Sequence, residues 1–403
     1  MKEITLAIAV MAVVSAGLAQ ENDGALIARA KAIHGRVLKL DTHNDIDPAN
    51  FTPDCNYKQR LTTQVNLPKM KEGGLDASFF IVYVGQGDLD AAGYERAYRA
   101  AVAKFDAVHR LTEQIAPKEI ELALTPADVL RISKSGKKVA VIGIENGYQM
   151  GTDIKRLKEF YDRGGRYMSP AHNGHNQLAD SHTGEAGNEW KWGGLSPLGR
   201  QVIQEMNRLG MMVDVSHPSK AAMLQMIGLS RAPVIASHSS VRKLANQTRN
   251  MDDEMLMAMK TNGGVVQINA VSEFIKKPPE RAATGRGGAG RGAGRGAAAP
   301  AAYRCSIETG APPAAPANPD RATVKDYVDH IDYAVKLIGI DHVGIASDFD
   351  GGGGVDGWNS AAESFNVTLE LVRRGYTEEQ IGKIWSGNLL RVWSEVEKVA
   401  KSY

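Results

Sequence analysis

Eight short apolar segments, each followed by a longer stretch that can form a helix, recur along this chain of 403 residues. Near-continuous apolar runs are typical of strands buried on both faces of a parallel sheet, and their alternation with helical stretches indicates repeated βα units. The segments are VLKLDTHN (37–44), LDASFFIVYVG (75–85), KKVAVIGIEN (137–146), GRYMSPAHN (165–173), GMMVDVSH (210–217), APVIASHS (232–239), GGVVQINA (263–270) and DHVGIASDFDG (341–351). Amphipathic stretches such as 95–114 and 323–338 lie between them. Eight such units predict an α/β fold, a (β/α)8 TIM-type barrel, which a chain of this length accommodates with inserted loops.

The first 20 residues have the pattern of a secretory signal peptide. A lysine at the second position is followed by an apolar run from Ile4 to Leu18, and small residues surround Ala19. The run is too short to span a bilayer comfortably, although an uncleaved anchor or a buried first helix would also fit it. We expect residues 1–20 to be removed, leaving a barrel domain over 21–403 that is exported to the periplasm or secreted, with no stable membrane span.

Residues 278–319 differ in composition from the rest of the chain, because they are rich in Gly, Ala and Pro and poor in apolar bulk. This predicts a flexible low-complexity insertion after the seventh strand, beside the mouth of the barrel. Arg286, Arg291 and Arg295, spaced by glycine, are similar to RGG-type RNA-binding segments. The formal net charge of only +2, the single aromatic residue of the tract, Tyr303, and the predicted export oppose that interpretation. We therefore expect no nucleic-acid partner.

The chain contains two cysteines, which are too few for a four-cysteine zinc site. Cys55 follows the first predicted strand and Cys305 lies in the insertion, so both should be on the mouth face. In an oxidising compartment they could form a disulfide that tethers the insertion over the site, and two free thiols are the alternative. Any metal ion must be held mainly by His, Asp and Glu.

Side chains that can bind metal occur where four of the predicted strands end. They are His43, Asp45, Glu145, His217 and His238. His43 and Asp45 are two residues apart on an extended chain and therefore point the same way. Each of the five alone could be a satisfied histidine, a helix cap or a loop acid, but together, at one end of a barrel, they suffice for two cations bridged by Glu145. Such ligands without thiolate favour zinc, with manganese or cobalt as alternatives, and two ions could hold a water between them and lower its pKa.

Three more polar residues lie at the same end of the predicted barrel: His172 ends the fourth strand, Asp348 ends the eighth, and Arg249 lies on the connection after the sixth. His172 could donate a hydrogen bond to a developing oxyanion. Asp348 could hold a substrate ammonium or move a proton, and Arg249 could bind a carboxylate with two hydrogen bonds. A core histidine, a helix-capping acid and a surface arginine are the ordinary alternatives.

The ordered motifs of the chain resemble those of the membrane dipeptidase (renal dipeptidase) family of zinc peptidases, in its bacterial form. The resemblance runs from about Val37 to Val396 and excludes the insertion. The motifs are DTHND (41–45), GIE (143–145), AHN (171–173), DVSH (214–217), SHSS (237–240), RN (249–250), GIASDFDG (344–351) and GNLLRV (387–392).

The resemblance implies a metallo-dependent hydrolase-like barrel with two zinc ions per chain. One ion would be bound by His43 and Asp45, the other by His217 and His238, with Glu145 bridging them. It further implies three roles near the substrate: His172 polarises the scissile carbonyl, Arg249 binds the C-terminal carboxylate, and Asp348 contacts the free amine and transfers the proton.

We therefore expect zinc-dependent hydrolysis of dipeptides by a metal-bridging hydroxide, with L,D-dipeptides among the candidate substrates. The enzymatic alternative is a metal-dependent amidohydrolase acting on N-acyl amino acids, lactams or lactones. The non-enzymatic alternative is an inactive barrel used as a binding protein. The resemblance also makes a homodimer a candidate assembly.

Overall fold

The computed structural model of the chain describes residues 23–276, 305–310 and 319–403. The predicted signal segment and the three glycine-spaced arginines lie outside the described residues. Each of the eight predicted segments contributes to the barrel. The strands are β1 (Leu40–Asp45), β2 (Ala77–Tyr83), β4 (Lys138–Glu145), β5 (Gly165–Met168), β6 (Met212–Val213), β7 (Ile235–Ser239), β8 (Val265–Asn269) and β9 (Val343–Ala346). A further short strand, β3 (Ile120–Leu122), which the sequence pattern did not predict, pairs in parallel with the start of β4.

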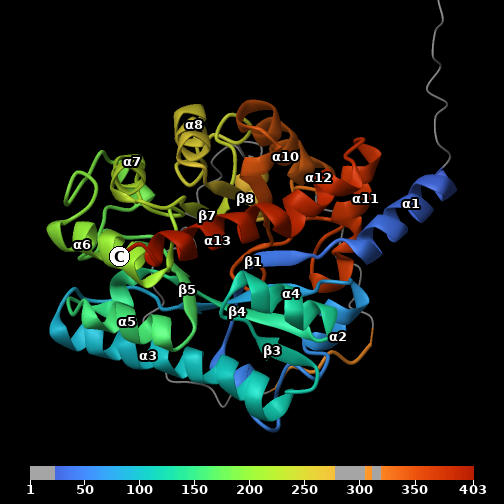
Figure 1. Cartoon of the computed structure of the whole chain (residues 1–403), viewed down its shortest axis with the longest axis horizontal. Coiled ribbons are helices and arrows are strands. Elements are labelled where there is room, and N and C mark those ends of the chain that lie inside the picture. The colour runs from blue at the N-terminus through green and yellow to red at the C-terminus, as the bar shows by residue number, and fades with distance from the viewer. Residues whose placement is uncertain (1–22, 277–304, 311–318) are drawn as a thin grey trace, which may run out of the picture.

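The strands form two parallel sheets, ordered β1-β2-β4-β5-β6 and β7-β8-β9. Two isolated parallel bridges join the sheets at both edges: Asp214 pairs with Ile235, and Asn44 pairs with Phe349. At the second junction the Asp45 amide donates to the Phe349 carbonyl at 2.9 Å. The eight strands therefore close into the ring of a (β/α)8 barrel, with helices around it (Figure 1), as predicted.

The helices begin where side chains satisfy their first free amides. Asp90 accepts a hydrogen bond from the Gly93 amide at the start of α3, and Thr323 forms a capping box with Asp326 at the start of α10. The helices are α1 (Asp23–Arg36), α2 (Leu67–Glu72), α3 (Ala91–Arg110), α4 (Pro126–Lys134), α5 (Lys155–Asp162), α6 (Pro197–Leu209), α7 (Lys220–Leu229), α8 (Asp253–Asn262), α9 (Ser272–Ile275), α10 (Val324–Ile338), α11 (Phe365–Arg373), α12 (Glu378–Gly382) and α13 (Asn388–Ala400). In the described ranges, none of them combines the length and apolar character that crossing a bilayer requires.

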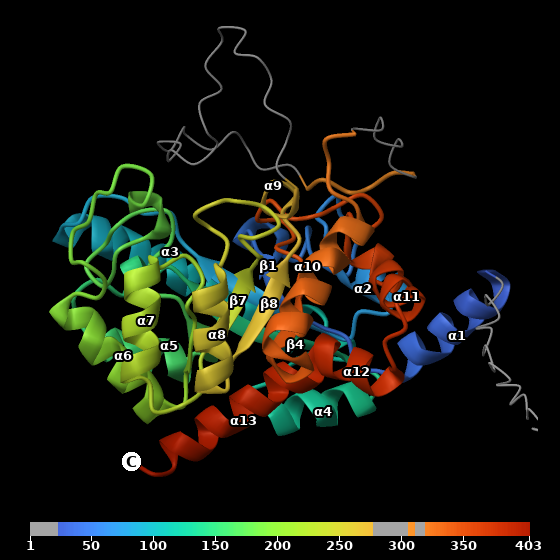
Figure 2. The same ribbon diagram turned by 90° about the horizontal axis from the view of Figure 1, so that it is seen from above.

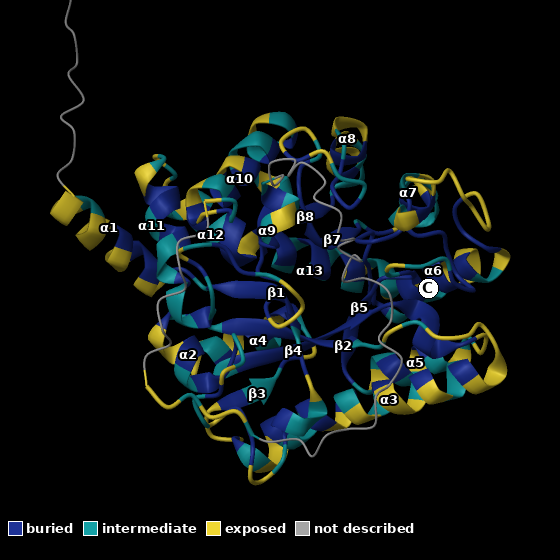
Figure 3. Ribbon diagram, turned by 180° about the vertical axis from the view of Figure 1, so that it is seen from behind, coloured by how far each residue is buried: buried dark blue, intermediate teal, exposed yellow. Residues whose placement is uncertain are grey.

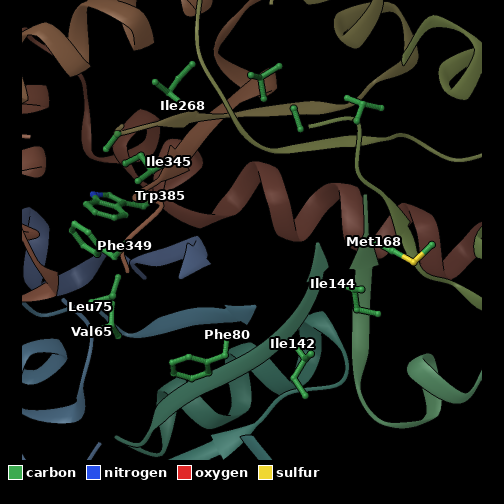
Figure 4. Close-up of a cluster of buried hydrophobic side chains, with 14 of the residues drawn as sticks. Val65, Leu75, Phe80, Ile142, Ile144, Met168, Ile268, Ile345, Phe349 and Trp385 are labelled. Atoms are coloured by element: carbon green, nitrogen blue, oxygen red, sulfur yellow. The ribbon is translucent and has the colours of Figure 1, made fainter. Parts of the chain in front are cut away.

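Alternation along the strands divides the apolar side chains into two layers. Phe80 packs in the layer between strands and helices, where Figure 4 shows it with other members of the cluster. Its neighbour Phe79 faces the barrel interior and packs against Tyr167 and against Trp393 of α13. Helix α13 crosses the barrel on the side opposite α9 (Figure 2), and the eight strands of the ring are buried over nearly their whole length (Figure 3). Apolar side chains thus fill the amino end of the interior. The polar residues that end the strands lie together at the carboxyl end, because all strands of the ring are parallel.

Cys55 and Cys305 form a disulfide whose Cα atoms lie 5.4 Å apart. Of the two alternatives that the sequence left open, the structure therefore contains the disulfide and not two free thiols. Two further contacts hold the residues that follow Cys305: Ile307 forms an isolated bridge with Leu61, and Glu308 forms an ion pair with Lys69 at 2.8 Å. Residues 305–310 are therefore fixed to the segment that follows β1, which includes helix α2.

Candidate metal centre and active site

The predicted metal ligands all lie at the carboxyl end of the barrel. Together with His172 and Asp348, their side-chain atoms fall into overlapping groups within 4.8 Å of one another: His43, Glu145 and His238; Glu145, His172 and His217; and His43, Asp45 and Asp348. The strand order makes this possible, because β1, β2 and β4 are neighbours and β7 follows the short β6 around the ring.

The Glu145 carboxylate lies at the centre of the cluster. Its Oε1 atom is 2.8 Å from Nε2 of His217 and 3.3 Å from Nε2 of His238. Its Oε2 atom is 3.6 Å from Nε2 of His43, which in turn is 3.7 Å from Oδ2 of Asp45. The two oxygens of one carboxylate therefore face two separate sets of ligands.

Hydrogen bonds behind the histidines determine which ring nitrogen carries the proton. The Nδ1 atom of His43 is 3.1 Å from the Tyr167 hydroxyl, which donates its own proton to the Thr42 carbonyl at 3.0 Å. That hydroxyl can therefore only accept from Nδ1–H. The Nδ1 atom of His217 lies 3.1 Å from the carbonyl oxygen of the Asn173 side chain, which also accepts. In the neutral form, both rings therefore have the lone pair on Nε2, the nitrogen that faces the site.

The same arrangement holds His238. Its Nδ1 atom is 2.8 Å from the Ser237 hydroxyl, and this hydroxyl donates to Asp214 at 2.6 Å. The Ser237 oxygen is therefore an acceptor for Nδ1–H, and Nε2 of His238 is left with its lone pair. This nitrogen is 2.9 Å from Nε2 of His217. Two lone pairs so close to each other and to a carboxylate repel unless a cation lies between them.

The charges of the site favour the same conclusion. Burial lowers the pKa of His217 and of His238 well below the ordinary value, so both rings are neutral. Burial also opposes a charge on His43, but Glu145, Asp348 and Asp45 outweigh it and raise its pKa to about 9. Nε2 of His43 is buried and has no hydrogen-bond partner among the described residues. A positive charge is thus favoured beside this atom, and a set of imidazoles and carboxylates without thiolate fits a divalent metal ion.

Strained backbone directs several of these side chains. His217 has a φ of 73° and Asp348 a φ of 58°, and Asn146 and Asp350, next to the site, are also left-handed. Among the other described residues, only Asn188 is a non-glycine residue with positive φ. Such conformations cost about 1–3 kcal/mol each and concentrate at functional sites.

Asp348 lies beside His43 and Asp45 of β1 and is buried. The Asn269 side-chain amide donates to its Oδ2 atom at 2.8 Å, and burial raises its pKa. A Cβ atom at Gly351 would lie 2.2 Å from Oδ2 of Asp45 and 2.4 Å from Oδ1 of Asp348. The chain therefore requires a glycine where it passes between these two carboxylates.

Arg249 is buried beside the second pair of histidines, contrary to the alternative of a surface arginine. Its guanidinium donates to the His238 carbonyl at 2.7 Å and to the Ser239 hydroxyl at 2.9 Å. The Nε atom has no hydrogen-bond partner among the described residues. Burial lowers the pKa of this guanidinium, and Asp348 and Glu145 oppose that effect. A buried cation with an unused donor is suited to an anion that enters the site.

His172 lies at the edge of the cluster with its Nε2 atom 3.7 Å from Oε1 of Glu145. Its ring packs on the ring of His217, with centroids 4.2 Å apart, and burial lowers its pKa. On the other side, Nδ1 lies 3.4 Å from the Tyr83 hydroxyl. The ring is thus neutral and can act as a hydrogen-bond donor or acceptor.

All eight predicted site residues therefore lie in one polar cluster, but the residues that orient them were not predicted from the sequence. His172 is contacted by Tyr83, His43 by Tyr167, and Asp348 by Asn269. Alternation could have placed Tyr167 inside the barrel, but nothing local indicates that it reaches β1. Three further residues that orient the histidines lie within the motifs, but the sequence indicated no role for them: Asn173, Asp214 and Ser237.

Comparison with known proteins agrees with this geometry. The profile of the membrane dipeptidase family (peptidase family M19) matches residues 27–403. Dipeptidase tcpJ of Claviceps purpurea (strain 20.1) is 33% identical over 380 residues, which are 91% of this chain and 79% of that protein. The crystal structure of the probable dipeptidase PvdM from Pseudomonas aeruginosa is 28% identical, with a TM-score of 0.79, and the match covers 94% of this chain and 100% of that one.

A metallo peptidase from Rhodobacter sphaeroides, solved with a phosphinate mimic of the dipeptide L-Ala-D-Ala, is 23% identical with a TM-score of 0.68 over 89% of this chain and 99% of that one, and shares the fold. The resemblance seen in the motifs is confirmed. The chain belongs to the membrane dipeptidase family, peptidase family M19, and is a metal-dependent dipeptidase.

Proposed function

We propose that the protein hydrolyses dipeptides at a binuclear zinc site in which Glu145 bridges the two ions. The observation that carries the proposal is that the two oxygens of this carboxylate face separate ligand sets. His43 and Asp45 would hold one ion, and His217 and His238 the other. When bound, the zinc pair supplies a nucleophile from water near neutral pH and a Lewis acid for the carbonyl.

Two charged residues would recognise the ends of the substrate. The buried Arg249 guanidinium, with its unused Nε donor, is suited to the C-terminal carboxylate of a dipeptide. Asp348 would contact the free amine. A longer peptide would leave one of these buried charges without its partner, which is a strong form of exclusion.

The chain's own groups would also assist the proton transfers. His172, neutral and next to Glu145, would donate a hydrogen bond to the oxygen of the scissile carbonyl as negative charge develops on it. Asp348, whose pKa is raised by burial, would accept the proton of the attacking water and return it to the leaving amine. Water would add to the carbonyl carbon, the C–N bond would break, and two free amino acids would result.

Two observations bear on substrate and location. The Rhodobacter sphaeroides relative was solved with a mimic of an L,D-dipeptide, so L,D-dipeptides belong among the candidate substrates. The Cys55–Cys305 disulfide supports export to an oxidising compartment after removal of residues 1–20. A homodimer and the absence of a nucleic-acid partner stay predictions.

The test is to incubate the purified mature chain with L,L- and L,D-dipeptides, before and after chelation and zinc re-addition. Hydrolysis should disappear with chelator and return as two zinc ions bind per chain, measured by elemental analysis. N-acetylated dipeptides and N-acyl amino acids are the matched comparison, because they lack the ammonium that Asp348 would bind. Faster hydrolysis of these blocked compounds would favour the amidohydrolase alternative, and full activity with one ion per chain would contradict the binuclear site.

A further inference from the structure

The four histidines of the site differ in the groups behind them. Each of the three histidines predicted to bind metal has a hydrogen-bond acceptor at Nδ1. For His43 and His238 the acceptors are the hydroxyls of Tyr167 and Ser237, which donate their own protons elsewhere, and for His217 it is the side-chain amide oxygen of Asn173. His172 instead has the Tyr83 hydroxyl, and this hydroxyl has no other hydrogen-bond partner among the described residues. The proton of this phenol is therefore free to be donated.

Tyr83 is held firmly in this position. It is the last residue of β2 and pairs with Glu145 of β4, so its side chain lies at the carboxyl end of the barrel. Its ring packs on the His172 ring, with centroids 4.6 Å apart. Burial, together with Glu145 and Asp45, raises the pKa of the Tyr83 hydroxyl well above its ordinary value. The hydroxyl thus stays protonated and acts as a donor.

The direction of this hydrogen bond determines the state of His172. A neutral imidazole carries one proton, so when Nδ1 accepts from the phenol, the ring proton is on Nε2. The Nε2 atom is the one that faces the site, 3.7 Å from Oε1 of Glu145. The ring would then present a donor to the substrate, whereas the three ligand histidines present lone pairs.

We propose that Tyr83 is a positioning residue that fixes the tautomer of His172, so that Nε2–H points into the site as a hydrogen-bond donor. The hydroxyl of Tyr83 thereby makes His172 a hydrogen-bond donor at Nε2, whereas the neighbouring histidines have a lone pair there. The inference rests on the proposed function for the catalytic consequence, but the tautomer itself can be measured without turnover.

The first experiment is Tyr83→Phe, which removes the hydroxyl and keeps the ring that packs on His172. In this variant kcat should fall about 10- to 100-fold, while KM for a dipeptide and the zinc content stay within twofold of wild type. Affinity for a phosphinate dipeptide mimic, whose oxygens resemble the developing oxyanion, should fall by a similar factor. Unchanged kcat and mimic affinity would overturn the proposal.

The second experiment measures the tautomer directly by ¹⁵N NMR of zinc-loaded enzyme labelled at histidine. In wild type, His172 should show a protonated Nε2 and an unprotonated Nδ1, and Tyr83→Phe should give a mixture of tautomers. A wild-type ring protonated at Nδ1 would refute the assignment whether or not the enzyme hydrolyses dipeptides. A tautomer that matches the proposal in a protein without dipeptidase activity would instead overturn only the proposed function.

Two matched variants separate this role from general damage. Tyr98→Phe removes another phenol, which donates to Glu159 at 2.7 Å away from the metal site, and kcat and the His172 tautomer should be unchanged. Tyr167→Phe removes the acceptor behind His43, and it should weaken zinc binding and leave the His172 tautomer intact. Loss of the tautomer in all three variants would show that it depends on general packing and would contradict the proposal.

Discussion

Gly351→Ala is a sharp test of the carboxylate arrangement, because this glycine lies between Asp45 and Asp348. An alanine Cβ would lie 2.2 Å from Oδ2 of Asp45 and 2.4 Å from Oδ1 of Asp348. To restore even a tight separation of 3.0 Å, the two oxygens must move by at least 0.8 and 0.6 Å. Gly351 does not have a positive φ, so an alanine can adopt its backbone conformation. The expected cost of the substitution is therefore the steric collision.

A displacement of about 1 Å in a catalytic group reduces the rate by about 100-fold, which corresponds to about 2.7 kcal/mol. We therefore expect kcat/KM for a dipeptide to fall by about that factor in Gly351→Ala, with weaker zinc retention because Asp45 is displaced. The assay is steady-state dipeptide hydrolysis together with zinc content and thermal unfolding. Gly228→Ala is the control, since a Cβ atom there meets nothing within 4 Å: it should leave kcat/KM and zinc content unchanged and, because Gly228 lies in helix α7, keep Tm the same or raise it slightly. Full zinc content and kcat/KM within twofold of wild type in Gly351→Ala would refute the reasoning.

Four other predictions follow from the site and its surroundings. Arg249→Ala should raise KM for dipeptides about 10- to 100-fold, because a charged hydrogen-bond partner is lost, and unchanged steady-state kinetics would contradict the role of the guanidinium. Asp348→Asn should mainly lower kcat, and turnover near wild type would rule out its proton transfer. Zinc affinity, measured by competition with a chelator, should weaken at least about tenfold per pH unit from pH 8 to pH 6, because the pKa of His43 is about 9 and that of Asp45 is about 7, and protons must leave both groups before zinc binds; a flat profile would exclude this competition. Cys305→Ser should lower the free energy of unfolding by about 2–4 kcal/mol and leave kcat unchanged, since the disulfide spans 250 residues, and an unchanged Tm would contradict this.

The barrel was predictable because its pattern is local. Strands buried on both faces are apolar along their whole length, so β2 and β4 stand out from the amphipathic helices around them. β3 escaped prediction because it has three residues and only one of them is fully buried. The predicted segment 210–217 contains only two strand residues, Met212–Val213, because the chain then turns toward His217, whose φ is 73°.

The candidate ligands could also be predicted, because a parallel barrel brings the carboxyl ends of all its strands to one face. They could be recognised as one group because each lies at the end of a predicted strand and because their motifs resemble those of the membrane dipeptidase family. The disulfide was one of two open alternatives, because the separation of Cys55 and Cys305 in space depends on where the inserted segment returns to the barrel.

The sequence by itself determined the fold class, the end of the barrel that carries the site, and the residue types available for a metal. Only the tertiary structure decided which nitrogen of each histidine faces the site, because Tyr83 and Tyr167 come from other strands than the rings they contact, and Asp214, from another segment, directs the Ser237 hydroxyl. The burial of Arg249 and the need for glycine at position 351 were likewise decided by packing. Hydrophobic periodicity is a property of one segment, whereas hydrogen-bond direction and steric fit depend on segments that only the folded chain brings together.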